Sequence, residues 1–279
     1  MGVDLSAATF LRSLTRKGAG LGRMLTLGHQ GIYMDKVAYK SFMTSLGRSA
    51  ERMDYADDLF NALGATSVDI MDVSNYEGAQ ILHDLNAPIP DEFRSGYDCV
   101  FDGGALEHVF NFPVALKNCM EMVKVGGHLV CITVANNYCG HGFYQFTPEL
   151  FYSSLSEVNG FAVESMLIFH SGRWFSVKKP EDTRGRVQIQ TSHPIQLFIA
   201  ARRVRQANIF ENWPQQSDYL QSWSETLQTK TNKSGEIKDR LVENVPSLRV
   251  LQSHWKAFKL AREYSFRNSD WFREVDLDA

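Results

Sequence analysis

The sequence predicts an α/β fold, a doubly wound sheet of about seven strands that is mostly parallel with an antiparallel last strand. Short apolar runs alternate with amphipathic helical segments from residue 23 to residue 204. The run at 97–104, "YDCVFDGG", is apolar through its centre, as expected of a strand covered on both faces. The runs at 161–170 and 193–204 have no helical segment between them, so we expect them to pair antiparallel.

Each element follows from the periodicity of its apolar residues. The expected strands cover residues 24–27, 67–74, 79–86, 97–104, 128–135, 161–170 and 193–204. The expected helices cover residues 5–17, two segments of 36–63 separated near Gly47, 113–124 and a segment that begins at 147–149. Pro113 suits the first turn of its helix, where no backbone N–H is needed. Residues 171–186 are polar and basic and predict a surface excursion.

We expect three parts: an N-terminal helix and flexible lead-in at 1–22, the α/β domain at 23–204 and a helical extension at 205–279. The net charge of −3 provides no field that favours nucleic acid or an anionic membrane. No apolar run approaches the ~18 residues of a membrane span. The N-terminus lacks a convincing signal peptide, and the four scattered cysteines predict reduced thiols. We therefore expect a cytoplasmic protein.

The residues that close the predicted strands are the candidates for a ligand site, because ligands of open α/β sheets bind outside the carboxyl ends of the strands. They are Gly28-His29-Gln30, Asp72, Asp84, Asp102-Gly103-Gly104 and Asn136-Asn137. Three strands that end in Asp are more than packing requires, since a carboxylate can accept hydrogen bonds from a ribose or a base amine. Each Asp can equally cap the following turn. Together they favour a nucleoside site.

Several classes of site are disfavoured by spacing. The glycine cluster at 18–22 precedes its strand, whereas a phosphate-binding turn must follow one. The turn at 28–31 lacks the G-x-G-x-x-G spacing of nicotinamide dehydrogenases. No Asn/Asp-Pro-Pro-Tyr/Phe sequence follows the fourth strand, which together with the charge disfavours nucleic-acid modification. No CxxC or His-x-x-x-His spacing suggests zinc, so we expect no metal.

Residues 97–136, "YDCVFDGGALEHVFNFPVALKNCMEMVKVGGHLVCITVAN", resemble the fourth- to fifth-strand segment of class I S-adenosylmethionine-dependent methyltransferases, which have a Rossmann-like fold. Residues 140–152, "GHGFYQFTPELFY", are similar to a bacterial subgroup tied to surface-glycan or secondary-metabolite pathways. The resemblance covers roughly residues 23–204. It implies that Asp72 holds the ribose hydroxyls and that Asp84, with Leu85, contacts the adenine. The cofactor site that it implies is completed by Gly28, His29, Gln30, Asp102, Gly103 and Gly104.

The chain departs from the family in its first loop. The family has an acid two residues before a Gly-x-Gly-x-Gly sequence, and these positions are Thr26, Gly28, Gln30 and Ile32 here. A Gln side chain protrudes into the space of the methionine or ribose, and loss of the acid removes a partner of the ammonium group. We therefore expect weak binding of S-adenosylmethionine.

Candidate catalytic residues follow the fourth and fifth strands. They are Glu107, His108, His141 and Tyr144. A hydroxyl acceptor gains from a base that titrates near neutral pH, which suits histidine. His141 lies between two glycines in an aromatic loop, a poor place for a core histidine, whereas His108 can equally brace the helix start. We expect the loop 136–146 to form one wall of the acceptor pocket; the alternative is that its aromatic residues pack under the next helix.

The leading hypothesis is methyl transfer from S-adenosylmethionine to a small molecule or glycan, at a hydroxyl group. The alternative is a catalytically silent methyltransferase-like protein that binds a nucleoside or a partner protein. A third reading is another reaction of the same fold with a different cofactor. We expect no nucleic-acid or membrane partner, and the sequence leaves a homodimer open.

Overall fold

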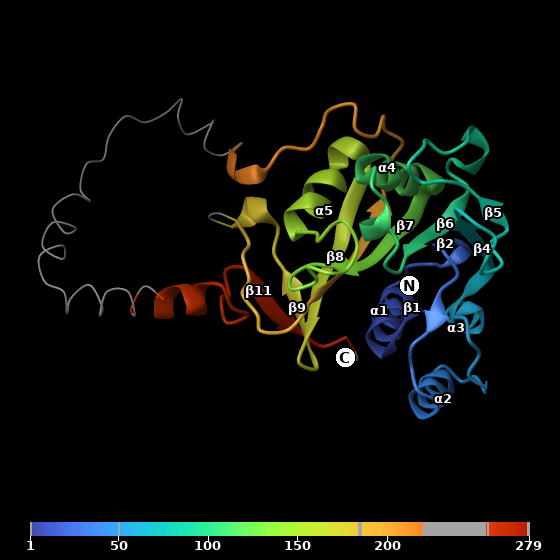
Figure 1. The fold of residues 1–279 in the computed structure, drawn as a ribbon, viewed down its shortest axis with the longest axis horizontal. Helices are drawn as coiled ribbons and strands as arrows, with labels where there is room; N and C mark the ends of the chain where they lie inside the picture. Colours follow the sequence, from blue (N-terminus) through green and yellow to red (C-terminus); the bar gives the residue numbers. More distant parts are fainter. Residues whose placement is uncertain (1, 50, 184–185, 220–254, 256, 278–279) are drawn as a thin grey trace, which may run out of the picture.

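The computed structural model describes residues 2–49, 51–183, 186–219, 255 and 257–277. It shows a nine-stranded sheet with helices on both faces (Figure 1). The strands are β1 (Gly2–Val3), β2 (Gly22–Leu27), β3 (Gly31–Ile32), β4 (Ala65–Asp72), β5 (Ile81–Leu82), β6 (Tyr97–Asp102), β7 (Val123–Val134), β8 (Phe161–His170), β9 (Arg173–Val177), β10 (Gln196–Arg203) and β11 (Phe272–Val275). The helices are α1 (Leu5–Arg16), α2 (Lys36–Ser45), α3 (Asp57–Ala62), α4 (Phe112–Met122) and α5 (Pro148–Ser154). Within the described ranges, no helix has the length and apolar character needed to cross a lipid bilayer.

The strand order confirms the predicted Rossmann-like fold. The large sheet has the order β11-β9-β8-β10-β7-β6-β2-β4-β5. Strands β5, β4, β2, β6 and β7 pair in parallel, and β10 pairs antiparallel with both β7 and β8. From β2 the chain builds outward through β4 to β5 and then returns to place β6 on the other side of β2. The order therefore reverses between β2 and β6, where such sheets bind ligands.

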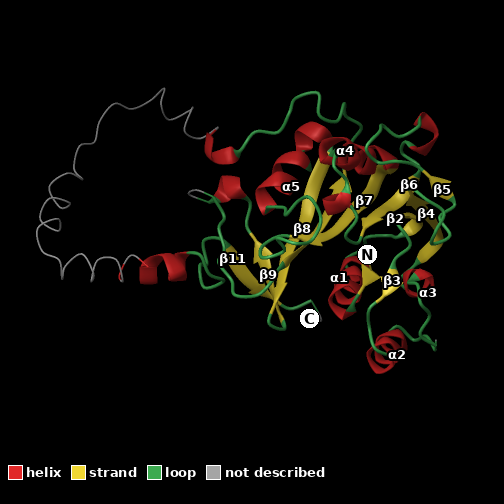
Figure 2. Ribbon diagram, viewed as in Figure 1, coloured by secondary structure: helices red, strands yellow, loops and turns green. Residues whose placement is uncertain are grey.

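The sheet separates two hydrophobic cores, because neighbouring residues of a strand point to opposite faces. Leu25 and Leu27 of β2 lie in one core, with side chains of α4 and α5. Met24 lies in the other core, with side chains of α1, α2 and α3. The helices accordingly cover the two faces of the sheet, which Figure 2 shows in red on either side of the yellow strands.

The structure corrects four expectations about the elements. The lead-in at 18–22 is built into the fold, because Leu21 is buried and Gly22 begins β2. The expected third strand is reduced to the two residues of β5. Residues 171–186 contain β9, which pairs with β8.

The C-terminal extension is also not wholly helical. Residues 257–263 are helical, but β11 pairs antiparallel with β9. The buried residues Trp271 and Phe272 belong to the same core as α4 and α5. An exposed edge of β9 would offer unpaired backbone groups, and β11 covers it. Residues 220–254, on which the rest of the helical prediction depends, lie outside the described part of the chain.

Replacement of Phe10 by Ala should show that α1 is part of the main core. The Phe10 side chain is fully buried, and its ring centroid lies 5.6 Å from that of Phe198 and 6.4 Å from that of Trp174. We expect Phe10→Ala to lower the free energy of unfolding by about 3–5 kcal/mol in urea titrations. Leu5→Ala, at the exposed start of α1, is the control and should change it by less than about 0.5 kcal/mol. If both substitutions changed the free energy of unfolding by the same small amount, the packing of α1 would not contribute to the stability of the core.

Candidate functional site

The register of the sheet brings the predicted loop and strand-end residues to one edge. Leu27 pairs with Met71 of β4, and Thr26 pairs with Phe101 of β6. The Gly28 backbone N–H donates to the Met71 carbonyl oxygen at 2.7 Å. Gly28 has a φ of 70°, a conformation that favours glycine and turns the chain over the end of β2. Gly28 therefore lies between the ends of β4 and β6, as predicted.

His29 braces the loop instead of facing a ligand. Its ring stacks on Tyr55, with centroids 3.5 Å apart and an interplanar angle of 4°. Nδ1 lies 2.7 Å from the Glu77 carbonyl oxygen, and Nε2 lies 2.9 Å from Oδ2 of Asp57. Both ring nitrogens are therefore engaged by the protein, and the part of His29 in a cofactor site stays a prediction.

Gln30 is buried between the ends of β2 and β6. Its Nε2 donates to the carbonyl oxygen of Leu27 at 2.7 Å, and Oε1 faces Gly103. A Cβ at Gly103 would lie 2.2 Å from this Oε1, so only glycine leaves room for it. The Gln30 side chain is thus packed against Gly103, and its projection into the space of a methionine or ribose stays a prediction.

The N-terminal strand β1 closes over the same place. The Gly2 backbone N–H donates to the Gly103 carbonyl oxygen at 3.3 Å, and β1 pairs in parallel with β3. Near these strand ends, the buried side-chain oxygens without a hydrogen-bond partner among the described residues include Thr26 Oγ1, Gln30 Oε1 and Asp102 Oδ2. Unpaired buried polar atoms are costly. No sequence pattern indicated the strand β1 that closes over Gly103.

Asp102 caps the turn after β6. Its side chain is fully buried, and Oδ1 accepts the backbone N–H of Ala105 at 2.7 Å and that of Leu106 at 3.3 Å. Burial, and then the charge of Glu107, raises the pKa of the Asp102 carboxyl well above its ordinary value of 3.8. Gly104, with a φ of 98°, turns the chain away from the strand.

The predicted nucleoside residues also cap turns. Oδ1 of Asp72 accepts the Ser74 backbone N–H at 3.3 Å, and Oδ1 of Asp84 accepts the backbone and side-chain N–H groups of Asn86 at 2.9 and 2.8 Å. These hydrogen bonds hold the pKa of Asp84 below its ordinary value. Asp84 is exposed and Asp72 is partly exposed, so both remain accessible to a ligand. Leu85 is half-buried and packs against the core.

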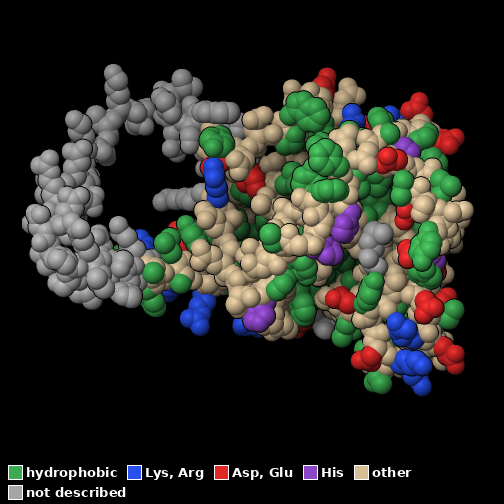
Figure 3. All heavy atoms as spheres, viewed as in Figure 1, with side chains coloured by type: hydrophobic (Ala, Val, Ile, Leu, Met, Phe, Trp, Pro, Cys, Tyr) green, Lys and Arg blue, Asp and Glu red, His purple; other side chains and the backbone are tan. Residues whose placement is uncertain are grey.

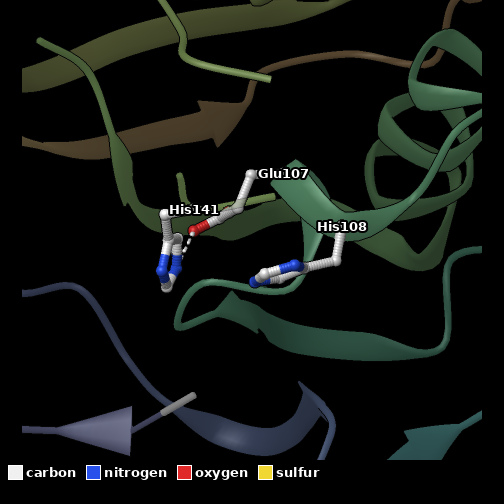
Figure 4. A group of neighbouring side chains, drawn as sticks. All are labelled: Glu107, His108 and His141. Atoms are coloured by element: carbon white, nitrogen blue, oxygen red, sulfur yellow. Dashed lines mark ion pairs between the residues drawn. The ribbon is translucent and has the colours of Figure 1, made fainter. Parts of the chain in front are cut away.

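Glu107, His108 and His141 form a cluster beside this edge (Figure 4). The first two belong to the short 3-10 helix Leu106–His108 after β6, and His141 belongs to the loop after β7. Nε2 of His141 lies 3.7 Å from Oε1 of Glu107, and the two histidine rings lie 4.9 Å apart. Histidine side chains gather near the middle of the face in Figure 3.

Thr133 is a site residue that the sequence analysis missed. Its Oγ1 donates to Oε2 of the buried Glu107 carboxylate at 2.9 Å. It is the next-to-last residue of β7, in an apolar segment whose pattern predicts only a buried strand. The one available signal was its position near the carboxyl end of a parallel strand.

Backbone hydrogen bonds hold the loop after β7 against Glu107. The backbone N–H groups of Phe143 and Tyr144 donate to the Glu107 carbonyl oxygen at 2.8 and 3.3 Å. Gly142 has a φ of 75°, and a Cβ there would lie 2.7 Å from the same oxygen. Glycine at 142 therefore permits the close approach that carries His141 to Glu107.

The aromatic residues of this loop were expected either to line an acceptor pocket or to pack under the next helix, and some of them pack while Tyr138 lines a cavity. Phe146 is buried and Tyr144 packs against the core, with its hydroxyl donating to the Phe110 carbonyl oxygen at 2.6 Å. The hydroxyl of Tyr144 thus has a partner within the protein, and the catalytic role of Tyr144 stays a prediction. Tyr138 lines a cavity of about 350 Å³ with Asp4, Phe169 and other residues of the β8 and β10 ends. The start of the loop lines this cavity, and Gln145 and Phe146 at its end line another; its role as a wall of the acceptor pocket stays a prediction.

Comparisons with known proteins give a distant structural likeness. No protein-family model and no curated protein sequence matches the chain. Among solved structures, the chain is similar to the N-methyltransferase NodS from Bradyrhizobium japonicum WM9 in complex with S-adenosyl-L-homocysteine, with 14% identity and a TM-score of 0.43. The match covers 72% of this chain and 87% of that one.

A second similar structure is an S-adenosylmethionine-dependent methyltransferase from Mesorhizobium loti, with 15% identity and a TM-score of 0.40, covering 71% of this chain and 100% of that one. A third is the 1,6-didemethyltoxoflavin-N1-methyltransferase of Burkholderia thailandensis, with 13% identity and a TM-score of 0.38, covering 71% and 79%. These likenesses agree with the fold class. They are too distant to carry an argument about ligand or reaction.

Asp102→Asn should change how stability depends on pH. Because the folded-state pKa of Asp102 lies above its ordinary value of 3.8, its contribution to stability is present below pH 3.8 and is lost as pH rises through the folded-state pKa. The neutral Asn side chain keeps an oxygen that can accept the two N–H groups and does not titrate. In urea titrations, the free energy of unfolding should therefore fall more with rising pH in the unmodified protein than in Asp102→Asn. Parallel pH profiles would contradict this.

Proposed function

We propose that the protein transfers the methyl group of S-adenosylmethionine to a hydroxyl of a small-molecule or glycan acceptor in the cytoplasm. The proposal rests on the residues that come together at the switch point of the sheet, between β2 and β6. Gly28 follows β2 and Asp72 ends the paired strand β4, and Glu107 and His141 come together from the segments that follow β6 and β7. This arrangement would place a nucleoside at the ends of the strands and a general base beside it.

The residues fit the nucleoside end of the cofactor better than its amino-acid end. Asp72 and Asp84 offer accessible carboxylates to ribose and adenine. Thr26 stands where the acid of the family would meet the ammonium group, and the unpartnered Oε1 of Gln30 is the acceptor nearest in sequence that can replace it. An amide oxygen carries no charge, so the replacement is weaker than a carboxylate. Displacement of β1 from Gly103 adds to the cost of binding.

His141 has the position of a general base. Bound S-adenosylmethionine would supply a methyl group already activated by its sulfonium, so that alignment is the main requirement. The acceptor oxygen forms the new C–O bond as the C–S bond breaks, and its proton goes to the ring of His141. The Glu107 carboxylate lies 3.7 Å from Nε2 and faces the ring. The His141 side chain is 49% exposed, which leaves it accessible to an acceptor.

A second candidate is a catalytically silent protein that binds a nucleoside or a partner protein. One observation favours it: Gln30 and the strand β1 occupy the ends of β2 and β6, where the methionine moiety is expected. The two candidates differ in turnover. Binding of S-adenosylhomocysteine without product formation from any acceptor supports the silent protein.

Asp72→Ala should abolish the weak binding of S-adenosylmethionine measured by calorimetry. Loss of a charge-assisted bond costs roughly 1.5–3 kcal/mol, or about one to two orders of magnitude in affinity. Glu92→Ala removes one exposed negative charge from the segment before β6 and is the matched control, which should bind as the unmodified protein does. Unchanged affinity in Asp72→Ala would place the site elsewhere.

His141→Ala should lower turnover by ~10²–10⁴-fold and leave cofactor affinity nearly intact. The measurement is release of S-adenosylhomocysteine with a panel of phenol and sugar acceptors. His83→Ala, at another strand end, is the control and should keep full turnover. If His141→Ala retains turnover within a few-fold of the unmodified protein, His141 is not the base.

A further inference from the structure

We propose that Glu107, His108 and His141 bind a divalent transition-metal ion. Each residue offers one ligand atom, and the three atoms all lie within 4.8 Å of one another. They come from two segments, the short helix after β6 and the loop after β7, which are far apart in sequence. Sequence spacing therefore could not show the group, and the absence of a metal motif led to the opposite expectation.

The distances are close to those of a coordination shell. Ligand atoms of a tetrahedral zinc site lie about 3.3 Å apart, given metal–ligand bonds of about 2.0–2.1 Å. Oε1 of Glu107 and Nε2 of His141 are already 3.7 Å apart. His108 and His141 are exposed, so their rings can rotate to close the remaining gap without repacking the core. Figure 4 shows His108 and His141 on either side of the Glu107 side chain.

The buried carboxylate is the feature that points to a cation. The Glu107 side chain is only 1% exposed, and a buried carboxylate is costly unless it is paired or coordinates a metal. Thr133 satisfies Oε2 and leaves Oε1 directed toward His141. A hydrogen bond such as that of Thr133 orients a metal-binding carboxylate.

The backbone holds the ligands in place before any ion arrives. The Glu107 carbonyl oxygen accepts the Phe143 N–H at 2.8 Å, which fixes the loop two residues after His141. The close contact of Gly142 with the same oxygen allows this seating. The metal therefore does not have to order the loop, and less conformational entropy is lost on binding.

The chemistry of the three ligand atoms indicates which class of ion the site would bind. Two imidazoles and one carboxylate suit Zn²⁺, Fe²⁺, Co²⁺ or Ni²⁺ better than Mg²⁺ or Ca²⁺, which prefer oxygen ligands alone. Three protein ligands leave a coordination position open, as in catalytic zinc sites. Tyr138, whose ring lies 5.7 Å from that of His141, also lines the 350 Å³ cavity. The open position can therefore take water or an acceptor oxygen from that side.

Metal binding changes the role of His141 without depending on methyl transfer. A ring that binds an ion through Nε2 cannot accept a proton at that atom. With the ion present, a hydroxyl coordinated at the open position loses its proton more readily. The site itself stands on the geometry of the three side chains and can be tested without any acceptor.

The test uses the untagged full-length chain, stripped with a chelator and titrated with CoCl₂ by visible absorption and with ZnCl₂ by calorimetry. We expect one ion per chain. His108→Ala, His141→Ala and Glu107→Gln should each lower affinity by more than the roughly 10- to 100-fold that loss of an outer-shell partner costs. His83→Ala is the matched control, because it removes a histidine from the same edge of the sheet and should bind as the unmodified protein does.

Two outcomes would overturn the proposal: an unmodified protein that binds neither ion, or variants that bind as tightly as the control. The two histidine variants change exposed side chains, and thermal melting of the metal-free proteins checks that they fold. S-adenosylmethionine binding is measured separately on the metal-free chain. Failure of that binding with an intact metal site rejects the proposed cofactor alone, and the reverse result rejects the metal alone.

Discussion

The pairing of β2 with β4 on one side and β6 on the other is the constraint on which the rest of the structure depends. Parallel pairing fixes the register, so that Leu27 stands beside Met71 and Thr26 beside Phe101. All residues that follow these strands must then emerge at one edge. The candidate site is the consequence, because Gly28, Asp72 and Gly103 meet there before any ligand is considered. Glu107 joins them through β7, whose Thr133 holds its carboxylate.

The loop after β2 lies at the position expected of a nucleotide loop, and its own side chains fill it. His29 is held by Asp57 and the Glu77 carbonyl oxygen, and Gln30 by the Leu27 carbonyl oxygen. A glycine-rich loop would leave that space to a cofactor. Here these contacts occupy the loop, and the buried Gln30 Oε1 has no partner among the described residues. The weak cofactor binding that we propose rests on this packing.

The sequence predicts the central fold well, because buried parallel strands and amphipathic helices carry strong periodic signals. The run at 161–170 matches β8 residue for residue. Prediction fails where pairing is made by tertiary context, as in β11, whose four residues become a strand only against β9. It also fails for Gly2–Val3, which is too short to show any period.

The candidate site was predicted in outline and missed in detail for the same reason. The strand-end rule predicts Gly28 and Asp72 as site residues, since it needs only the ends of strands, and the glycines around it single out His141 in the loop after β7. Which side chains are used by the protein depends on contacts across long sequence distances. The His29 ring stacks on Tyr55, and the Tyr144 hydroxyl donates to the Phe110 carbonyl oxygen. The Glu107 carboxylate accepts the Thr133 hydroxyl. No spacing within one sequence indicates these contacts.

Hydrogen–deuterium exchange, with and without saturating S-adenosylhomocysteine, tests the central claim most directly, because it locates the ligand on the sheet. If the switch point between β2 and β6 is the cofactor site, added protection should appear in peptides covering residues 24–33, 67–74 and 101–108. The peptides of β9 and β11, on the far edge of the sheet, should not change. Protection confined to other segments, or none at a ligand concentration that calorimetry shows to be saturating, would contradict the account.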